Sequence, residues 1–286
     1  MSHRLKEYAL NQVLPIVLTF VVCAVLIGLI YLEILLLNKF TPACIKGISC
    51  ILPSIHIQDV LIGMTIYLKT SVDFAIFIGN LMHSYPTWKA RIAIEIGTAT
   101  GNALGTIVIL AIWNYFRDIR LLLAAMILLA ALVLFELAEE GLEHTHTAGY
   151  NLPEWFYALA DKFQTVLHRI NSFTAPLLRR IIPNLSMKPK TGLTFMGLFA
   201  MSFTIPFILG LDDFAGYVPV FNIVNVFGFS CGVLLGHMIL NIFLFISPNA
   251  TIKIVKNPVI SFVGSVAFVM LAVWGLYEVV KLLFLH

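Results

Sequence analysis

The sequence predicts an all-α, polytopic membrane protein with seven transmembrane helices, arranged as one N-terminal helix followed by two inverted three-helix repeats. Composition is the first observation, because 60% of the 286 residues are hydrophobic and only 12% are charged, about half the charged share of an average soluble domain. The second is that apolar runs of the roughly 20 residues needed to cross a bilayer recur along the chain. The third is that polar motifs of runs two to four recur in runs five to seven.

Composition also excludes several other classes of protein. A soluble core of this length could not bury so many apolar side chains, and disordered, collagenous or coiled-coil chains contain more charge or more glycine and proline. The formal net charge of +3 is too small to indicate a nucleic-acid partner. The expected partner is therefore the lipid bilayer.

The expected spans are, in chain order, 13–37, 59–82, 90–113, 121–142, 193–215, 218–246 and 258–285. The first span follows Arg4 and Lys6, as the apolar core of a signal peptide would. Its apolar stretch is longer than such a core, and no small-residue cleavage site follows it. We therefore expect this first span to be retained as a transmembrane helix.

The distribution of basic residues predicts the orientation in the membrane. With the N-terminus in the cytoplasm, twelve of the 18 Lys and Arg residues fall inside and five fall outside, in agreement with the positive-inside rule. We therefore expect a multi-pass protein of the cell inner membrane with a cytoplasmic N-terminus and a periplasmic C-terminus. Cys44 and Cys50 then share the first outer loop, where an oxidising compartment allows either a disulfide or two free thiols.

These assignments divide the chain into four parts. The parts are the N-terminal transmembrane helix with an outer loop (1–57), the first three-helix repeat (58–142), a cytoplasmic interfacial amphipathic segment (143–191) and the second three-helix repeat (192–286). Between Pro153 and Pro183 the third part carries apolar residues at helical spacing, with charged and polar residues between them. That pattern is typical of a helix in the headgroup region, which serves as a linker or as a docking or regulatory segment.

Two short motifs recur in the two halves. The tripeptide Asp-Phe-Ala occurs at 73–75 in the second span and at 213–215 at the end of the fifth. The next span carries three glycines spaced by four, and the far half of the span after that holds an acid. These residues are Gly97, Gly101, Gly105 and Glu136 in the first half, and Gly228, Gly232, Gly236 and Glu278 in the second. Because each unit has three helices, the two copies must cross the membrane in opposite senses, as the inverted repeats of secondary transporters do.

The glycine spacing predicts how the repeats pack. Residues four apart share one helix face, and glycine there lets another backbone approach closely. We expect the third and sixth spans to cross through these glycines. Such a crossing would bring together the two helices that carry Asp73 and Asp213.

Charged residues inside the second span need a partner or a purpose, because each costs at least about 2.5–3.5 kcal/mol at the bilayer centre. Lys69, Asp73 and Asn80 are spaced to share one helix face. One interpretation is a structural pair in which Lys69 and Asp73 neutralise each other. The other is that Asp73 is a cation ligand and Lys69 is its resting counter-charge.

The third span carries a polar stripe beside its glycines. Glu95, Thr98 and Asn102 fall at positions i, i+3 and i+7 and therefore on one face. Glu95 also lies four residues after Arg91, so an ion pair at the helix end competes with a binding role. Asn102, deep in the span, is a candidate ligand.

The second half offers two further polar groups. Asp212 and Asp213 are flanked by Pro206, Gly210, Gly216 and Pro219, which would break the helix and expose carbonyl oxygens beside two carboxylates. Such an oxygen cage suits a hard divalent cation, although an outer loop with solvated acids fits the same residues. His237 and Asn241, one turn apart, could bind metal, relay protons or simply pack.

Acidic and histidine residues gather at the inner end of the fourth span. The cluster comprises Glu136, Glu139, Glu140, Glu143 and His144. It fits a cytoplasmic vestibule that gathers cations on the side from which an exporter loads, and equally a solvated helix end. Its sequence, EEGLEHTH over 139–146, lacks the HExxH spacing of zinc proteases.

An Asp-Phe-Ala motif in each three-helix unit, followed by a glycine-spaced helix, resembles the lysine-exporter superfamily. Among its branches the chain is most similar to the cadmium-resistance, manganese-exporter and tellurium-resistance-C transporters. The resemblance implies two inverted three-helix units that export metal cations, or amino acids in other branches. By position, it implies that Asp73 and Asp213 are the paired central carboxylates that bind metal, with Asn80 and Asn102 as auxiliary ligands.

The sequence therefore predicts a secondary transporter rather than an enzyme, exporting a divalent metal cation by alternating access between the repeats. Its candidate ligands are mostly oxygens, and we expect no matching thiol partners near Cys23 and Cys231, which favours Mn²⁺, Ca²⁺ or Mg²⁺ as cargo over Cu⁺, with Zn²⁺ possible through His237. No GxxxxGK[ST] motif occurs, so ATP-driven pumping by this chain is not expected. No resident cofactor is expected either.

The sequence leaves three other functions open. The first is export of an amino acid or other small solute, whose carboxylate Lys69 would bind. The second is a non-transporting membrane subunit or biogenesis factor, and the third a membrane enzyme built on the Glu/His cluster. A homodimer or a larger membrane complex is compatible with each.

Overall fold

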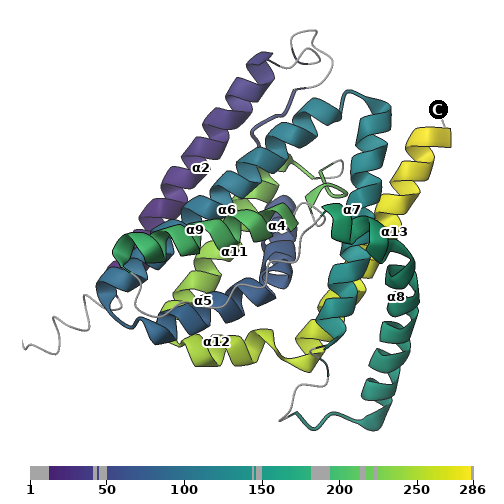
Figure 1. Ribbon diagram of the computed structural model, residues 1–286. Helices are drawn as coiled ribbons and strands as arrows, with labels where there is room; N and C mark the ends of the chain where they lie inside the picture. Colours follow the sequence, from purple (N-terminus) through teal and green to yellow (C-terminus); the bar gives the residue numbers. More distant parts are fainter. Residues whose placement is uncertain are drawn as a thin grey trace, which may run out of the picture. The chain divides into compact units, whose positions relative to one another are not determined.

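The computed structural model describes residues 13–40, 44, 50–143, 145, 150–181, 194–212, 217–221 and 224–284, with the side chains of 73, 174–181 and 208–212 left out. The described residues form α-helices joined by turns and contain no β-strand, which confirms the all-α prediction (Figure 1).

Five helices are long and apolar enough to cross a membrane. They are α2 (Leu14–Phe40), α6 (Trp88–Phe116), α7 (Arg120–Glu143), α11 (Val226–Ile246) and α13 (Pro258–Phe284). Each corresponds to one of the expected spans. The chain is therefore a multi-pass helical membrane protein.

The second expected span is broken rather than continuous. It consists of α4 (Ile57–Thr70) and α5 (Val72–Ser84), whose axes meet at 66°, and Figure 1 shows α5 turning away from α4. Ser71, between them, donates its N–H to the Tyr67 carbonyl and accepts from Ala75 N–H. The pair forms a sixth crossing if it counts as one broken span, or else a re-entrant segment.

The fifth expected span corresponds to α9 (Phe195–Asp212), with Pro206 inside the helix. The part of α9 whose side chains are described, Phe195–Phe207, is apolar but too short to qualify as a span by itself. The described residues therefore contain five spans, or six, in place of the expected seven.

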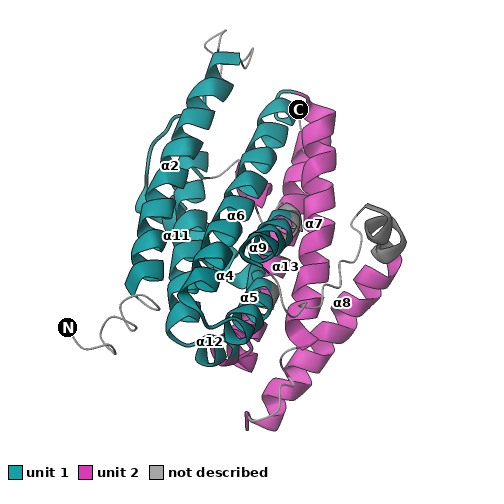
Figure 2. Ribbon diagram, turned by 60° about the vertical axis from the view of Figure 1, so that its left-hand side comes forward, with its two compact units in different colours: residues 1–118, 189–213, 223–252 teal, residues 119–188, 214–222, 253–286 magenta. Residues whose placement is uncertain are grey.

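The helices fall into two compact units, each of which draws on both predicted repeats (Figure 2). Unit 1 comprises 1–118, 189–213 and 223–252, and unit 2 comprises 119–188, 214–222 and 253–286. In unit 1, α6 packs on α9, α4 packs on α11, and α2 contacts both α6 and α11.

Glycines allow the two closest contacts of unit 1, but not the contact that their spacing predicted. A Cβ atom at Gly101 of α6 would clash with the carbonyl oxygen of Phe203 on α9, and one at Gly232 of α11 would clash with that of Val60 on α4. The expectation that the two glycine rows pack on each other is therefore wrong. Each row instead receives the first helix of the other predicted repeat.

Side-chain caps start two of these helices. The Thr87 hydroxyl accepts the Ala90 N–H at the start of α6, and Asn225 Oδ1 accepts the N–H groups of Phe227 and Gly228 at the start of α11. Ser, Thr, Asp and Asn at this position satisfy N–H groups that have no partner within the helix. The caps fix where the two glycine-bearing helices begin.

Unit 2 contains α7, α13 and the helix α8 (Glu154–Ile181). α7 packs along α13 and against α8, and Phe156 and Phe163 of α8 contact Phe262 of α13. The amphipathic helix predicted between Pro153 and Pro183 therefore forms. A short helix, α12 (Pro248–Val255), precedes α13.

The two cysteines of the first loop are bridged. The sulfur atoms of Cys44 and Cys50 form a disulfide that closes a loop with a sequence separation of six residues. This finding selects one of the two alternatives that the sequence left open.

Candidate functional site

The polar stripe predicted in the third span, now α6, is buried inside unit 1. Glu95 and Thr98 of α6 are 0% exposed and Asn102 is 2% exposed. Because these residues fall on one face of α6, they present a carboxylate, a hydroxyl and an amide along a line inside a mostly apolar bundle. A charged or polar group there is costly unless it has partners.

α11 provides the partners of Glu95. The amide nitrogen of Asn241 donates to Glu95 Oε2 at 2.8 Å and lies 3.3 Å from Thr98 Oγ1. It also lies 3.0 Å from Nε2 of His237, one turn earlier on α11. Both α11 residues are buried, with His237 3% and Asn241 0% exposed. Polar residues that the sequence assigned to two different halves thus form one cluster.

Tyr67 of α4 extends this cluster to a third helix. Its hydroxyl lies 2.7 Å from Nδ1 of His237, and its ring meets the imidazole edge-on at a centroid distance of 5.7 Å. When the Asn241 amide donates to Nε2, the neutral imidazole carries its proton on Nδ1 and donates to the Tyr67 oxygen. A hydrogen-bonded chain then runs from Tyr67 through His237 and Asn241 to Glu95. We call these four residues the central cluster.

Two oxygens of the central cluster and one amide nitrogen beside it make no hydrogen bond. They are Oε1 of Glu95, Oδ1 of Asn241 and Nδ2 of Asn102, each fully buried. The Thr19 hydroxyl of α2 lies near the Glu95 carboxylate but donates to the Pro15 carbonyl at 2.9 Å. Buried polar atoms in proteins are nearly always satisfied, and exceptions mark functional sites or bound ions. A proton or small cation at Glu95 Oε1 would neutralise the carboxylate without disturbing the bond to Asn241.

The residues assigned to metal binding lie largely outside the described part of the chain. Asp73 lies in the first turn of α5 and Asp212 ends α9, but the side chain of neither is described, and Asp213 is not among the described residues. Within the described residues, no group of three or more His, Cys, Asp or Glu side chains could hold a metal ion. The predicted pair of Asp73 and Asp213 stays a prediction.

The break after α4 corrects the expected geometry of the second span. Lys69 lies at the end of α4, whereas Asp73 and Asn80 lie on α5 beyond the 66° bend, so the three residues do not belong to one continuous helix. Asn80 is exposed. Helical spacing predicts a shared face only where the helix is continuous.

The predicted vestibule belongs to unit 2, at the end of α7. Glu136 and Glu139 are half-buried, Glu140 and Glu143 are exposed, and His144 is not among the described residues. Glu139 is held by α8, because its Oε1 lies 2.7 Å from Nδ1 of His168 and its Oε2 accepts the Asn171 amide at 2.6 Å. At least one of the acids therefore fastens one helix to another rather than facing an open vestibule.

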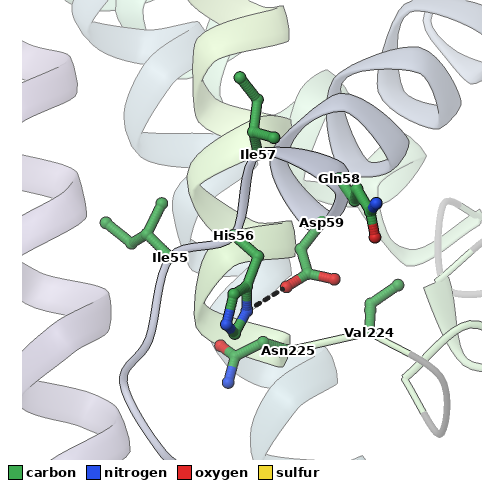
Figure 3. A pocket seen from close by; sticks show the side chains of 7 residues that line it. All are labelled: Ile55, His56, Ile57, Gln58, Asp59, Val224 and Asn225. Carbon is green, nitrogen blue, oxygen red and sulfur yellow. Dashed lines mark hydrogen bonds and ion pairs between the residues drawn. The ribbon is translucent and has the colours of Figure 1, made fainter.

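A pocket with a mixed polar and apolar lining lies at the start of α4 in unit 1 (Figure 3). Its volume is about 810 Å³, and its lining consists of Ile55, His56, Ile57, Gln58, Asp59, Val224 and Asn225. Nδ1 of His56 lies 3.1 Å from Oδ2 of Asp59, and Figure 3 shows both side chains directed toward the same space as Asn225. A carboxylate that holds one imidazole nitrogen orients the other one for proton transfer or ligand binding.

The pocket does not continue to the central cluster. Asp59 and Tyr67 are eight residues apart on α4, or about 12 Å along a helix. Between them, a Cβ at Gly63 would clash with the backbone carbonyl of Phe229 on α11. The two helices touch there, so backbone contact separates the pocket from the cluster.

Sequence reasoning missed four residues of interest. Tyr67 was overlooked because a lone tyrosine in an apolar span resembles any packed aromatic residue. Asp59 was taken only as the first residue of the second span, and His56 was not considered. Their i, i+3 spacing was the available signal. Glu33 of α2 was also missed, although both of its carboxylate oxygens are buried without a hydrogen bond.

The thiols correct a further expectation. Cys23 of α2 and Cys231 of α11 are both buried, and the Cys23 thiol donates to the carbonyl oxygen of Leu234 on α11 at 3.9 Å, so Cys23 lies against the helix that carries Cys231. Their separation in the sequence concealed this, because the α2–α11 contact brings the two spans together.

Comparison with known proteins adds no relative from which a function could be transferred. The chain matches no protein-family model, no curated protein and no solved structure.

Proposed function

We propose that this chain is a secondary membrane transporter that moves a small cation, and specifically exports a divalent metal ion, by alternating access between two inverted repeats. The central cluster is its candidate site for the transported cation or for a coupled proton. The proposal rests chiefly on one observation, the burial of Glu95 without a cationic partner among its hydrogen bonds.

The chemistry of the central cluster supports this function. A fully buried carboxylate is stable only if it is neutralised, and Glu95 receives one amide donor at 2.8 Å while its other oxygen makes no hydrogen bond. A purely structural polar contact would pair both oxygens. A carboxylate that binds and releases a cation or proton during each cycle needs one oxygen that is open to it.

The pairing of helices supports an inverted repeat. If α4 corresponds to α9, α6 to α11 and α7 to α13, then the α6–α9 contact corresponds to the α11–α4 contact, and the α7–α13 contact corresponds to itself. A two-fold operation that exchanges the halves requires this pattern of contacts. The glycine rows obey the same exchange, because each receives the first helix of the other half.

Interrupted helices in corresponding places give further support. The first Asp-Phe-Ala motif follows the break between α4 and α5, and the second follows the end of α9. Short or broken apolar helices at matching positions of two repeats are typical of transporter binding sites, because unwound backbone and half-helix ends can face an ion.

The Cys44–Cys50 disulfide supports the proposed orientation. Structural disulfides form in oxidising compartments, so a bridged loop after α2 is expected on the periplasmic side of an inner membrane. The N-terminus is then cytoplasmic, in agreement with the distribution of basic residues.

Transport by the purified chain tests the proposal. We would reconstitute it in liposomes that contain a pH-sensitive dye and a metal-sensitive dye, and measure the flux of Mn²⁺, Ca²⁺ and Mg²⁺ with and without a pH gradient. The wild type is expected to move at least one of these ions. Glu95→Gln, which keeps the shape and the amide contact but removes the charge, is expected to abolish that flux.

Glu154→Gln is the matched control, because Glu154 is an exposed acid at the start of α8 and its neutralisation should leave transport unchanged. Asp73→Asn and Asp213→Asn test the pair of carboxylates implied by the motif. Flux through Glu95→Gln at the wild-type rate would remove the central cluster from the proposal. A wild type that moves none of the ions under any gradient would contradict cation transport altogether.

A further inference from the structure

α8 divides lengthwise into three strips, of which the first faces the protein. Phe156, Ala160 and Leu167 are buried, Phe163 contacts Phe262, and all four fall within about 40–60° of one another at 3.6 residues per turn. This strip packs against α7 and α13. One side of the helix is therefore occupied by its own unit.

A second strip is apolar but exposed. Its members are Trp155 (66% exposed), Leu159 (46%), Val166 (55%), Ile170 (37%) and Phe173 (89%). At 3.6 residues per turn they lie within a band about 60° wide, beside the buried strip rather than opposite it. We call these five residues the apolar stripe. A contiguous exposed surface of this kind marks an interaction site.

The third strip is polar, and its basic residues border the apolar stripe. Lys162 and Arg169 lie about 20° and 40° beyond the edge of the stripe, on the side away from the protein. Both side chains are exposed, and neither forms an ion pair with another described residue. Asp161, Thr165 and Ser172, also exposed, lie farther round the helix.

Hydrogen bonds to α7 fix the rotation of α8 about its axis. Glu139 accepts the Asn171 amide at 2.6 Å and pairs with His168 at 2.7 Å, and Asn171 also donates to the Phe135 carbonyl at 2.9 Å. With α8 held in this way, the apolar stripe cannot turn toward α7. It must meet something outside the unit.

We propose that the apolar stripe of α8, with Lys162 and Arg169 at its edge, is a binding surface for anionic lipids at the cytoplasmic boundary of the membrane. The stripe enters the acyl-chain region, Trp155 lies at the interface, and the two basic side chains extend to lipid phosphates. Charge complementarity selects this occupant, because cations beside an apolar band match a negatively charged leaflet.

Spin labels on single introduced cysteines, in a chain whose Cys23 and Cys231 are replaced by Ser, test this surface in the full-length protein. Labels would be placed at 159 and 166 in the stripe and at 165 and 172 on the polar face, in nanodiscs of phosphatidylcholine with phosphatidylglycerol. Oxygen accessibility relative to that of a water-soluble nickel complex is expected to be several-fold higher at the stripe positions. Equal ratios on both faces would overturn the proposal, and exclusion of both reagents from the stripe would show that a protein surface covers it instead.

The charge requirement is tested separately with the label at 166. Removal of phosphatidylglycerol from the nanodisc is expected to make the label shallower, and Lys162→Gln with Arg169→Gln is expected to abolish this dependence. The matched control is Lys89→Gln with Lys253→Gln, which removes the same charge from exposed positions off α8 and should preserve it. If Lys162 and Arg169 are intact and the depth of the label is the same with and without phosphatidylglycerol, recognition of anionic headgroups is refuted.

Discussion

A single carboxylate carries most of the functional interpretation. Glu95 is a fully buried acid in an apolar helix, and its hydrogen bond comes from a neutral amide rather than from a cation. The sequence placed Glu95, His237 and Asn241 among the candidates because polar residues in apolar spans are costly. It could not indicate that they meet, since 146 residues separate Glu95 from Asn241.

The role of Tyr67 in the central cluster gives a prediction at this scale. Tyr67→Phe removes the hydroxyl next to His237 Nδ1 and leaves a buried ring nitrogen without its partner. Loss of such a partner costs about 1–3 kcal/mol. We expect a lower melting temperature in detergent and a reduced cation flux in liposomes.

Tyr277→Phe is the control for that experiment. Tyr277 is 54% exposed on α13, so removing its hydroxyl leaves no buried group of the central cluster without a partner. Loss of the Tyr277 hydroxyl should change neither the melting temperature nor the cation flux. If Tyr67→Phe behaved like Tyr277→Phe, Tyr67 would have no functional role in the central cluster.

Helix packing depends on glycines whose partners only the structure identifies. Their spacing by four predicted a close helix contact, and close contacts are present in unit 1. The partner helix was predicted wrongly, because the spacing of glycines identifies the helix face that allows a close approach but not the helix that packs against it. The break at Ser71 was missed for a similar reason, since no proline or glycine interrupts 64–78.

Gly232→Ala tests the α4–α11 contact at the scale of the elements. The added methyl group would meet the carbonyl oxygen and neighbouring backbone of Val60, which cannot move without shifting α4. Overpacking of this kind costs about 1–3 kcal/mol or more. We expect thermal unfolding in detergent at a clearly lower temperature than for the wild type.

Gly28→Ala is the control, because this substitution is not expected to lower the unfolding temperature. No atom lies within 4 Å of a Cβ at this position in α2, and alanine is favoured over glycine inside a helix by about 0.5–1 kcal/mol. This variant should be unchanged or more stable. If the two alanine variants unfolded at the same temperature, the close approach at Gly232 would not be required.

The topology of the whole molecule yields the last prediction. The proposed arrangement, an N-terminal span followed by two inverted three-helix repeats, would cross the membrane an odd number of times, so in that arrangement the two ends lie on opposite sides. Cysteines introduced at Ser2 and at His286, in a chain whose own four cysteines are replaced by Ser, can be labelled in intact cells with a membrane-impermeant maleimide. We expect labelling at the C-terminal position only.

Lysis before labelling is the control, because both cysteines must then react equally. Labelling of both positions, or of neither, in intact cells would mean an even number of crossings. In that case one interrupted element, α4 with α5 or α9, would be a re-entrant segment, and the inverted repeat would fail.

The sequence by itself determined that this chain is an all-α membrane protein, where its five long spans lie and that an amphipathic helix precedes α9. Those properties follow from local composition and from the 3.6-residue period, which each segment carries within itself. Tertiary structure alone decided which glycine row meets which helix, that α4 and α5 are separate, and that Tyr67, His237, Asn241 and Glu95 form one hydrogen-bonded chain. These depend on contacts between distant segments, and such contacts are set by how the helices pack against one another.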